Sequence, residues 1–583
     1  MRARGRLILF AGAVLLVGSA AAVVHVGRTA IDLQHAIEAA GVHAEAAVKD
    51  VAAGDITGAE KAASLLSAEI GPAIPTDDPV WGAAEAVPGI GANLSAARRA
   101  AVAMERVGEN VAPPLLATAR KLADADAPAA IGVLREAAPD LERVAATRDD
   151  IADDLAGIDR SALIPQLSDG VAKIVDAIDR LKPLTEGADQ LAGVLPAFLG
   201  ADGDRRILVM LQNPAELRTG GGITGTFLEL DARDGRVSLV AQRDSSQFTS
   251  AAEPLVPVPE GETRALGDGI GRYVQNTSMT ADFTVTAQLA SAWWTRSGMS
   301  APDAVVSVDP IVLAAVLGVI GPVETSAGAL DQKNVVDRLL VEPYRTLDQD
   351  AQGRWFADAA AAVFTAVTER ARPVAMIPAL AGAVDEGRIS VWSRDPDEQS
   401  VLARTPFAGP LARQDAAGPD AFAAYFNDAT GGKLTPYLSV GLGIRSGVCR
   451  ADELREVEVE VDLGSALTRA EGRTLPISVT GGGAYGIPAG HIAPVVTVVA
   501  PPGWFVGGVE IDGQPVAAAN ARVGDRPSVT HRVDLPPGES HSVAFRFVAG
   551  PNVESGNRSP SLLHTPLLES VDVRSGAIAC RAS

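Results

Sequence analysis

Apolar residues form an uninterrupted stretch near the start of the chain. Residues Leu7–Val24 include no charged side chain, and Arg2, Arg4 and Arg6 precede them. As a helix this stretch is about 27 Å long, which is close to the thickness of the hydrocarbon core of a bilayer. Because basic residues favour the cytoplasmic side, the pattern predicts a cytoplasmic tip and a transmembrane helix within residues 1–28, with the body outside the cytoplasm.

A cleaved signal peptide is the alternative interpretation of the same stretch. Small residues from Ser19 to Ala22 can supply a cleavage site. The apolar stretch Ile311–Ile320 is too short to be a second span. If the leader is kept, it acts as a signal anchor, and we expect a single-pass protein of the plasma membrane with its N-terminus in the cytoplasm. Whether the leader is cleaved stays open.

The next segment, residues 29–198, has a helical pattern. Apolar residues recur at intervals of three and four, and Gly71-Pro72 and Pro113-Pro114 mark turns between helices. We expect a helical stalk or bundle here. A partner-binding coiled coil is the less favoured alternative, because no heptad pattern continues over several repeats.

Short apolar runs typical of strands begin after this segment. Ile207–Leu211, Gly225–Leu230 and Val237–Val240 are such runs, and Arg233-Asp234-Gly235 has the composition of a hairpin turn. Helical and strand patterns then alternate, which predicts a mixed α/β core domain over residues 199–448.

Residues 449–583 have a third pattern, of short β-type runs between Gly/Pro turns. Val457–Val461, Pro476–Thr480 and Val495–Val499 are examples, and the spacing predicts a β-sandwich of the immunoglobulin-like sort. The predicted fold class is therefore multidomain α+β: a transmembrane helix, a helical stalk, a central mixed α/β domain and a C-terminal β-sandwich.

Two cysteines, Cys449 and Cys580, flank this last module. Neither lies in a metal-ligand spacing or a CxxC motif. We predict that they form a disulfide bond, which closes a loop of roughly 130 residues and persists only in an oxidising compartment. Two separate buried thiols are the alternative.

Charge narrows the range of partners. The chain of 583 residues has a formal net charge of -22, which argues against binding of nucleic acid by the body as a whole. The histidines all lie outside the predicted α/β core, which argues against a histidine-based hydrolase or a zinc enzyme there; they are His25, His35, His43, His491, His531, His541 and His564. We predict no cofactor and no metal site. The pair Trp293-Trp294 could stack on a sugar ring, but burial in the core is the favoured interpretation.

The most distinctive stretch follows the first predicted strand. It runs from Leu211 to Gly222 and places Asn, Glu and Arg ahead of three glycines, where backbone amides can approach a ligand closely. It has neither the GxGxxG nor the P-loop spacing of nucleotide sites. The alternative is a glycine-rich turn with structural hydrogen bonds. The candidate ligand-binding residues in and around this stretch are Asn213, Glu216, Arg218, Gly220, Gly221, Gly222, Asn276 and Asp282.

Several motifs in order resemble those of the bacterial family that contains domain of unknown function 4012. They are Ile207–Gly222, Asn276–Phe283, Asp303–Pro310 leading to Gly321-Pro322-Val323, and Phe426-Asn427-Asp428 with Gly432-Lys433. The Gln275-Asn276 pair departs slightly from the asparagine-rich form of this pattern. The resemblance implies a single-span, extracytoplasmic protein of the cell envelope without an established activity.

A fainter resemblance is to the LytR-CpsA-Psr phosphotransferases, which move glycan from lipid pyrophosphate carriers to the cell wall. Arg243-Asp244 follows a strand here as an Arg-Asp pair does in that family. The resemblance implies that Arg218 and Arg243 bind pyrophosphate while Asp244, with Asp282, holds Mg²⁺ or activates an acceptor hydroxyl. The alternative is a surface turn with a local ion pair.

Two main hypotheses of function remain. The first is a non-catalytic envelope protein that acts as a scaffold or binding protein in cell-wall or surface-polysaccharide assembly, with a polyprenyl-linked glycan or cell-wall polymer as partner. The second is a phosphotransferase with Arg243 and Asp244 as catalytic candidates and Mg²⁺ as cofactor. An adhesive or sensory ectodomain is a third. Convergence of Arg218 and Arg243 on one cleft beside Asp244 distinguishes the second from the others.

Overall fold

The computed structural model describes residues 2–52, 54–123, 125, 127–370, 373–553 and 559–579. Within these ranges the side chains of 2–19, 52, 127, 183–184, 191, 373–374 and 377–378 are not described. The chain divides into two compact units, one of residues 1–196 and one that begins at residue 197. The α/β and β-sandwich segments, which the sequence presents as separate domains, lie together in the second unit.

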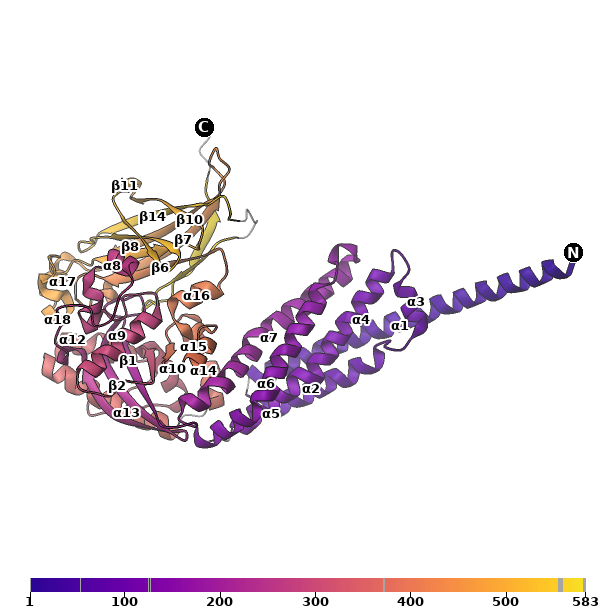
Figure 1. The fold of residues 1–583 in the computed structure, drawn as a ribbon, viewed down its shortest axis with the longest axis horizontal. Coiled ribbons are helices and arrows are strands. Elements are labelled where there is room, and N and C mark those ends of the chain that lie inside the picture. Colours follow the sequence, from indigo (N-terminus) through magenta and orange to yellow (C-terminus); the bar gives the residue numbers. More distant parts are fainter. Residues whose placement is uncertain are drawn as a thin grey trace. The chain divides into compact units, whose positions relative to one another are not determined.

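The first unit is helical, as predicted (Figure 1). Alanines of α4 pack against aliphatic side chains of α6 and α7, for example Ala100 against Ile151 and Ile178. Small side chains let the helix axes come close, which explains how a segment with few aromatic residues forms a core. The helices are α1 (Arg2–Ala52), α2 (Ile56–Ile70), α3 (Pro79–Glu85), α4 (Gly91–Arg106), α5 (Ala112–Ala123), α6 (Ala127–Ala156) and α7 (Pro165–Phe198).

The predicted transmembrane span is not tested by the described residues. Among them, no helix is both long and apolar enough to cross a bilayer. Most of Leu7–Val24 falls within residues 2–19, whose side chains lie outside the description.

The second unit begins with a five-stranded sheet of order β3-β2-β1-β4-β5. Strands β1 and β4 are parallel, and the other neighbours are antiparallel. The β2–β3 hairpin turns at Asp234 and Gly235, whose positive φ angles of 46° and 79° fit the predicted turn. The strands are β1 (Arg205–Asn213), β2 (Ile223–Arg233), β3 (Arg236–Asp244), β4 (Ala304–Val308) and β5 (Ser390–Ser393).

Helix α9 (Phe283–Arg296) packs on one face of this sheet. Trp293 and Trp294 are 1% and 0% exposed and lie in a core with Leu208 and Phe227, so both belong to the hydrophobic core and cannot stack on a sugar. The remaining helices of this part are α8 (Glu260–Leu266), α10 (Pro310–Ile320), α11 (Val335–Leu340), α12 (Glu342–Thr346), α13 (Gln349–Arg370), α14 (Pro373–Asp385), α15 (Pro396–Leu402) and α16 (Pro410–Ala416).

Two further sheets face each other across one large core and form a β-sandwich. Their strand orders are β11-β10-β14-β8-β7-β16 and β12-β13-β9-β6-β15. The strands are β6 (Ala421–Asp428), β7 (Leu438–Gly447), β8 (Glu456–Ser465), β9 (Pro494–Val499), β10 (Trp504–Ile511), β11 (Gln514–Val516), β12 (Ala519–Val523), β13 (Arg526–Arg532), β14 (Ser540–Ala549), β15 (Ser561–His564) and β16 (Val573–Ala577).

The sandwich differs from the sequence prediction in two places. It begins with β6 and β7, which precede the expected boundary at residue 449. Residues 421–427 are all buried, so β6 lacks the alternating pattern that marks a strand with one solvent face. The expected strand Pro476–Thr480 is instead a short helix, α18 (Ile477–Thr480), which ends at Gly481 in the left-handed conformation. Helix α17 (Arg469–Thr474) precedes it.

The predicted disulfide bond falls partly outside the description, because Cys580 is not among the described residues. Strand β16 runs parallel to β7, and this pairing brings the carbonyl oxygen of Ile578 within 3.8 Å of the Cys449 Sγ. No described cysteine is free. The Cys449–Cys580 pairing stays a prediction.

The two core tryptophans allow a matched stability test. Trp294 donates its Nε1–H to the buried carboxylate of Glu229 at 2.5 Å, whereas the Nε1 of Trp293 has no hydrogen-bond partner among the described atoms. Trp294→Phe leaves the Glu229 carboxylate without this donor, so we expect it to lower the free energy of unfolding by about 1–3 kcal/mol more than Trp293→Phe. Urea denaturation of both variants measures this difference, and equal losses would show that the hydrogen bond adds nothing to stability.

Candidate functional site

The stretch singled out in the sequence is the loop that joins β1 to β2. Asn213 ends β1, and its Oδ1 accepts a hydrogen bond from the backbone N–H of Ala215 at 3.0 Å. A Cβ on Gly222 would lie 2.3 Å from the carbonyl carbon of Asn213, and Gly221 has a φ of 115°. Glycine is therefore required at both positions for the loop to fold back on itself.

Glu216 lies at the centre of this loop and is 3% exposed. One carboxylate oxygen accepts a hydrogen bond from Arg218 Nη2 at 2.8 Å. The other accepts from the Nζ of Lys433. A buried carboxylate is tolerated only when such partners replace water, and here two cations do so.

Arg218 makes further contacts with its guanidinium group. Its Nη1 donates to the carbonyl oxygens of Leu217 at 2.8 Å and Asp428 at 3.2 Å, and its Nη2 approaches the Oδ1 of Asn276 at 3.4 Å. Its Nε has no partner among the described atoms. Both terminal nitrogens of the guanidinium group thus donate their hydrogen bonds to acceptors of the protein itself.

Lys433 and Tyr344 complete the cluster. The Lys433 ammonium lies 5.5 Å from the centre of the Tyr344 ring, a cation–π arrangement. The Tyr344 hydroxyl accepts a hydrogen bond from Asn213 Nδ2 at 2.6 Å. Burial, reinforced by the negative charges of Glu216 and Asp244, raises the pKa of Tyr344, so its hydroxyl stays protonated.

The two carboxyl groups of the cluster have opposite pKa shifts. Burial alone would raise the pKa of Glu216, but the charges of Lys433 and Arg218 outweigh it and lower that pKa. Burial and the neighbouring Glu216 charge raise the pKa of Asp428 to about 6, although Arg218 and the hydrogen bonds from Thr430 and Gly431 oppose the shift. As the pH falls from neutral, Asp428 therefore takes up a proton before Glu216 does.

The same loop joins the α/β sheet to the β-sandwich. The backbone N–H of Asp428 donates to the Leu217 carbonyl at 2.8 Å, and that of Thr435 donates to the Ala215 carbonyl at 3.0 Å. The side chain of Asn427 accepts from the Thr219 N–H and donates to the Thr219 hydroxyl. Leu217 is buried in the core of the sandwich. The Glu216 cluster thus lies where the two halves of the unit meet.

The structure brings together some of the predicted site residues. Asn213, Glu216, Arg218 and Asn276 are linked as described above. Gly220 and Gly222 bond through their backbones to Ser278, with the Gly220 N–H donating to its carbonyl and the Gly222 carbonyl accepting from its hydroxyl. These contacts give the two glycines a structural role in the loop.

The remaining candidates have hydrogen-bond partners outside the cluster, although the charge of Asp244 acts on Tyr344. Arg243 Nη2 approaches the Ser297 carbonyl and the Met299 sulfur just beyond α9, so Arg243 shares no hydrogen-bond partner with Arg218 among the described residues. Asp244 accepts from the Ser246 N–H and caps a short 3-10 helix. Asp282 caps the N-terminus of α9 by accepting from Thr284. Among the described residues, no hydrogen bond links Arg243 or Asp244 to Arg218, and the two-arginine pyrophosphate site stays a prediction.

Sequence reasoning did not assign a role to three members of the cluster. Asp428 and Lys433 lie in the last motif of the family resemblance, and that motif is the feature of the sequence that could have identified them as site residues. Nothing in the sequence around Tyr344 indicates that it contacts Asn213. Among the described residues, no group of three or more His, Cys, Asp or Glu side chains could hold a metal ion.

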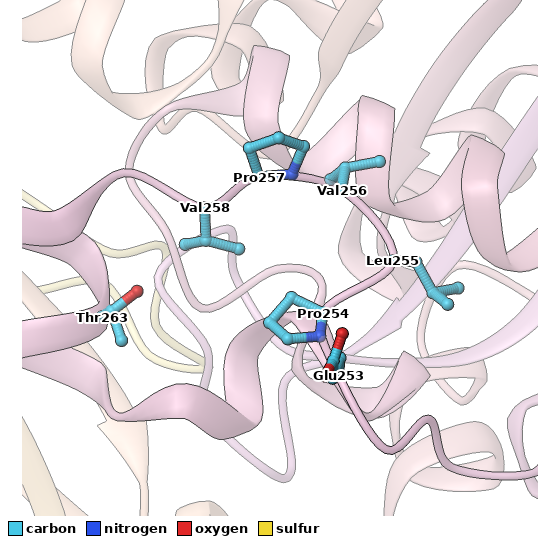
Figure 2. A pocket seen from close by; sticks show the side chains of 7 residues that line it. All are labelled: Glu253, Pro254, Leu255, Val256, Pro257, Val258 and Thr263. Carbon is cyan, nitrogen blue, oxygen red and sulfur yellow. The ribbon is translucent and has the colours of Figure 1, made fainter.

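A second feature is a hollow of about 400 Å³ (Figure 2). The loop Glu253–Val258 and Thr263 of α8 line it, and most of these side chains are apolar. It includes no residue of the Glu216 cluster, and its only charged lining residue is Glu253.

Comparison with known proteins supports the main resemblance. Residues 202–344 match the family model described as "Protein of unknown function (DUF4012)", which confirms the predicted resemblance over that region. Similarity to the LytR-CpsA-Psr phosphotransferases is not shown. No curated protein matches the chain. One solved structure, a mutant two-domain M1 zinc metallopeptidase bound to L-tryptophan, is 16% identical over 21% of this chain and 23% of that one, with a TM-score of 0.11, and supports no argument about fold or function.

Removing one cation from the cluster should cost much more than removing a surface cation. Arg218→Met leaves Glu216 with Lys433 alone and frees two backbone carbonyls, so we expect a loss of about 3–5 kcal/mol in the free energy of unfolding. The control is Arg264→Met, which breaks an exposed pair with Glu260 and should cost at most about 1 kcal/mol. Chemical denaturation measures both, and similar small losses would contradict the central role of Arg218.

Asp428 should impose a pH dependence on stability. Its folded-state pKa of about 6 lies above the usual aspartate value of 3.8, so its contribution to stability is fully present below about pH 3.8 and is lost as the pH rises through about 6. Glu216 acts oppositely, because its lowered pKa adds stability that is lost as the pH falls. Asp428→Asn should therefore flatten the decline in the free energy of unfolding between about pH 4 and about pH 6. Denaturation curves across this window test it; an unchanged slope in Asp428→Asn would refute the assignment.

Proposed function

We propose that this chain, which matches the DUF4012 family over residues 202–344, is a membrane-anchored, extracytoplasmic scaffold or binding protein in the assembly of cell wall or surface polysaccharide. In this proposal the N-terminal helix holds the protein in the plasma membrane as a single-pass anchor. The β-sandwich and the α/β sheet then form one rigid body outside the cytoplasm.

The observation that supports a non-catalytic role is how the cluster uses its cations. Arg218 and Lys433 both pair with Glu216, and their side chains are 7% and 15% exposed. A site that binds and transfers a phosphate needs cations that the substrate can reach. Here the cations neutralise a carboxylate of the protein itself, which favours a structural task for the whole loop.

The contacts of Arg243 give a second reason to prefer the scaffold. A phosphotransferase site requires Arg218 and Arg243 in one cleft beside Asp244. Arg243 contacts the residues after α9, and Asp244 caps a 3-10 helix, while Arg218 contacts Glu216 and Asn276. We therefore propose binding of a glycan or cell-wall polymer without transfer.

The proposal is tested with the full chain in detergent. We expect it to sediment with purified cell-wall polysaccharide and to transfer no glycan from a polyprenyl pyrophosphate-linked oligosaccharide in the presence of Mg²⁺. Arg243→Ala should bind as well as the unmodified chain. Protease added to the outside of spheroplasts should digest the body of the protein.

Each part of the proposal has its own contradicting result. Glycan transfer that disappears in Arg243→Ala would replace the scaffold by an enzyme. Lack of sedimentation with every envelope polysaccharide would remove the binding role. Protection of the body from external protease would remove the extracytoplasmic location.

A further inference from the structure

A short helix covers the edge of one sandwich sheet. Strand β12 is an outermost strand of its sheet, next to β13 only. Arg522 of β12 lies opposite Pro527, one position beyond the pair Val523–Arg526 that closes the hairpin. Because paired and unpaired positions alternate along an antiparallel ladder, the backbone groups of Arg522 point away from β13, toward the free edge.

Helix α8 packs on that edge by backbone contact. A Cβ on Gly261 would lie 1.9 Å from the Arg522 carbonyl oxygen. Only glycine lets the helix approach the strand so closely. The loop before α8 is Glu253–Pro259, which contains three prolines and lines the hollow of Figure 2.

Glu262 is the buried residue of α8, and its carboxylate forms no ion pair among the described residues. It is 3% exposed, and its Oε1 accepts one hydrogen bond, from the Thr280 hydroxyl at 2.8 Å. The Thr280 oxygen in turn accepts from the Asp282 N–H at 3.0 Å. Among the described residues, no Lys, Arg or His pairs with Glu262, in contrast to the two cations on Glu216.

None of the charged groups around Glu262 pairs with its carboxylate among the described residues. Asp282 from the start of α9 and Tyr425 from β6 are its titratable neighbours. Arg522 of β12 donates to the Asp525 carbonyl, and Arg413 of α16, which faces Tyr425, donates to the Asp385 and Glu386 carbonyls. On the helix itself Arg264 pairs with Glu260, and after it Arg272 pairs with Asp268.

We propose that residues 253–266, here called the α8 flap, open and close over the free edge of β12 according to the protonation of Glu262. The neutral carboxyl fits its buried position and keeps the flap on the strand. The ionised carboxylate, beside Asp282 and without a counter-ion, is stable only in water and releases the flap. Release uncovers the outward-facing backbone groups of β12 at this edge of the sheet.

The pKa of Glu262 lies near neutral pH. Burial raises its pKa to about 7, against the hydrogen bond from Thr280, which lowers the pKa, and with a smaller contribution from the charge of Asp282. This pKa lies above the usual glutamate value of 4.5, so the closed state is fully favoured below about pH 4.5 and loses that advantage as the pH rises through about 7.

Hydrogen exchange of the full chain, followed by mass spectrometry, tests the proposal. After correction for the intrinsic exchange rate, protection of peptides from 253–266 should fall by up to about tenfold per pH unit between about pH 4.5 and about pH 7 and level off above pH 7, while β13 stays protected. Glu262→Gln should remove this pH dependence. The matched control Glu260→Gln, an exposed position on the same helix, should keep it.

A second variant keeps the test decisive if Glu262→Gln does not fold. Thr280→Val removes the one hydrogen bond to the carboxylate, so the pH at which protection is lost should rise. An exchange profile of the α8 flap that does not change with pH in the unmodified chain would overturn the proposal. So would a pH dependence that persists unchanged in Glu262→Gln.

Discussion

The ion pairs of Glu216 with Arg218 and Lys433 are the interaction on which the second unit depends. A carboxylate that is 3% exposed needs ion-pair or hydrogen-bond partners, because the cost of burying it without them would exceed much of the net free energy of unfolding of a domain. Arg218 comes from the same loop, whereas Lys433 lies 217 residues later, just after the first sandwich strand. One side chain thus links the end of β1 to the start of the sandwich within a single compact unit.

This arrangement also guides the interpretation of function. Glu216 and Arg218 are charged, lie close to glycines and follow a strand, which in the sequence suggests a ligand-binding site. In the structure their charges are paired with other groups of the protein. The contrast with Glu262 is informative, because that buried carboxyl has only a hydroxyl donor. The first carboxyl stabilises a permanent junction between sheets, and the second is suited to a contact that changes with pH. A scaffold that presents a rigid body and one adjustable edge is consistent with both.

Local signals in the sequence predicted much of the fold. The helical segment, the hairpin at Asp234-Gly235 and the β1 strand follow from periodicity and turn composition. Fully buried β6 has no alternation to reveal it, and the run Pro476–Thr480 is too short for its period to separate strand from helix. Asn213, Glu216 and Arg218 were found because they are neighbours in one motif, whereas the contact of Tyr344 with Asn213 is set by tertiary packing. The contacts of Arg243 with Ser297 and Met299 join segments far apart in the sequence, so no local signal reveals them.

The central claim is that Glu216 and Lys433 act as one unit across the junction. A double-mutant cycle measures this most directly, with urea denaturation of Glu216→Gln, Lys433→Met, the double variant and the unmodified chain. We predict that the double variant is more stable than the sum of the single losses implies, by about 1–3 kcal/mol, because each single change leaves a buried charge without its partner. Losses that add to within about 0.5 kcal/mol would show that the two residues act independently and would contradict the account.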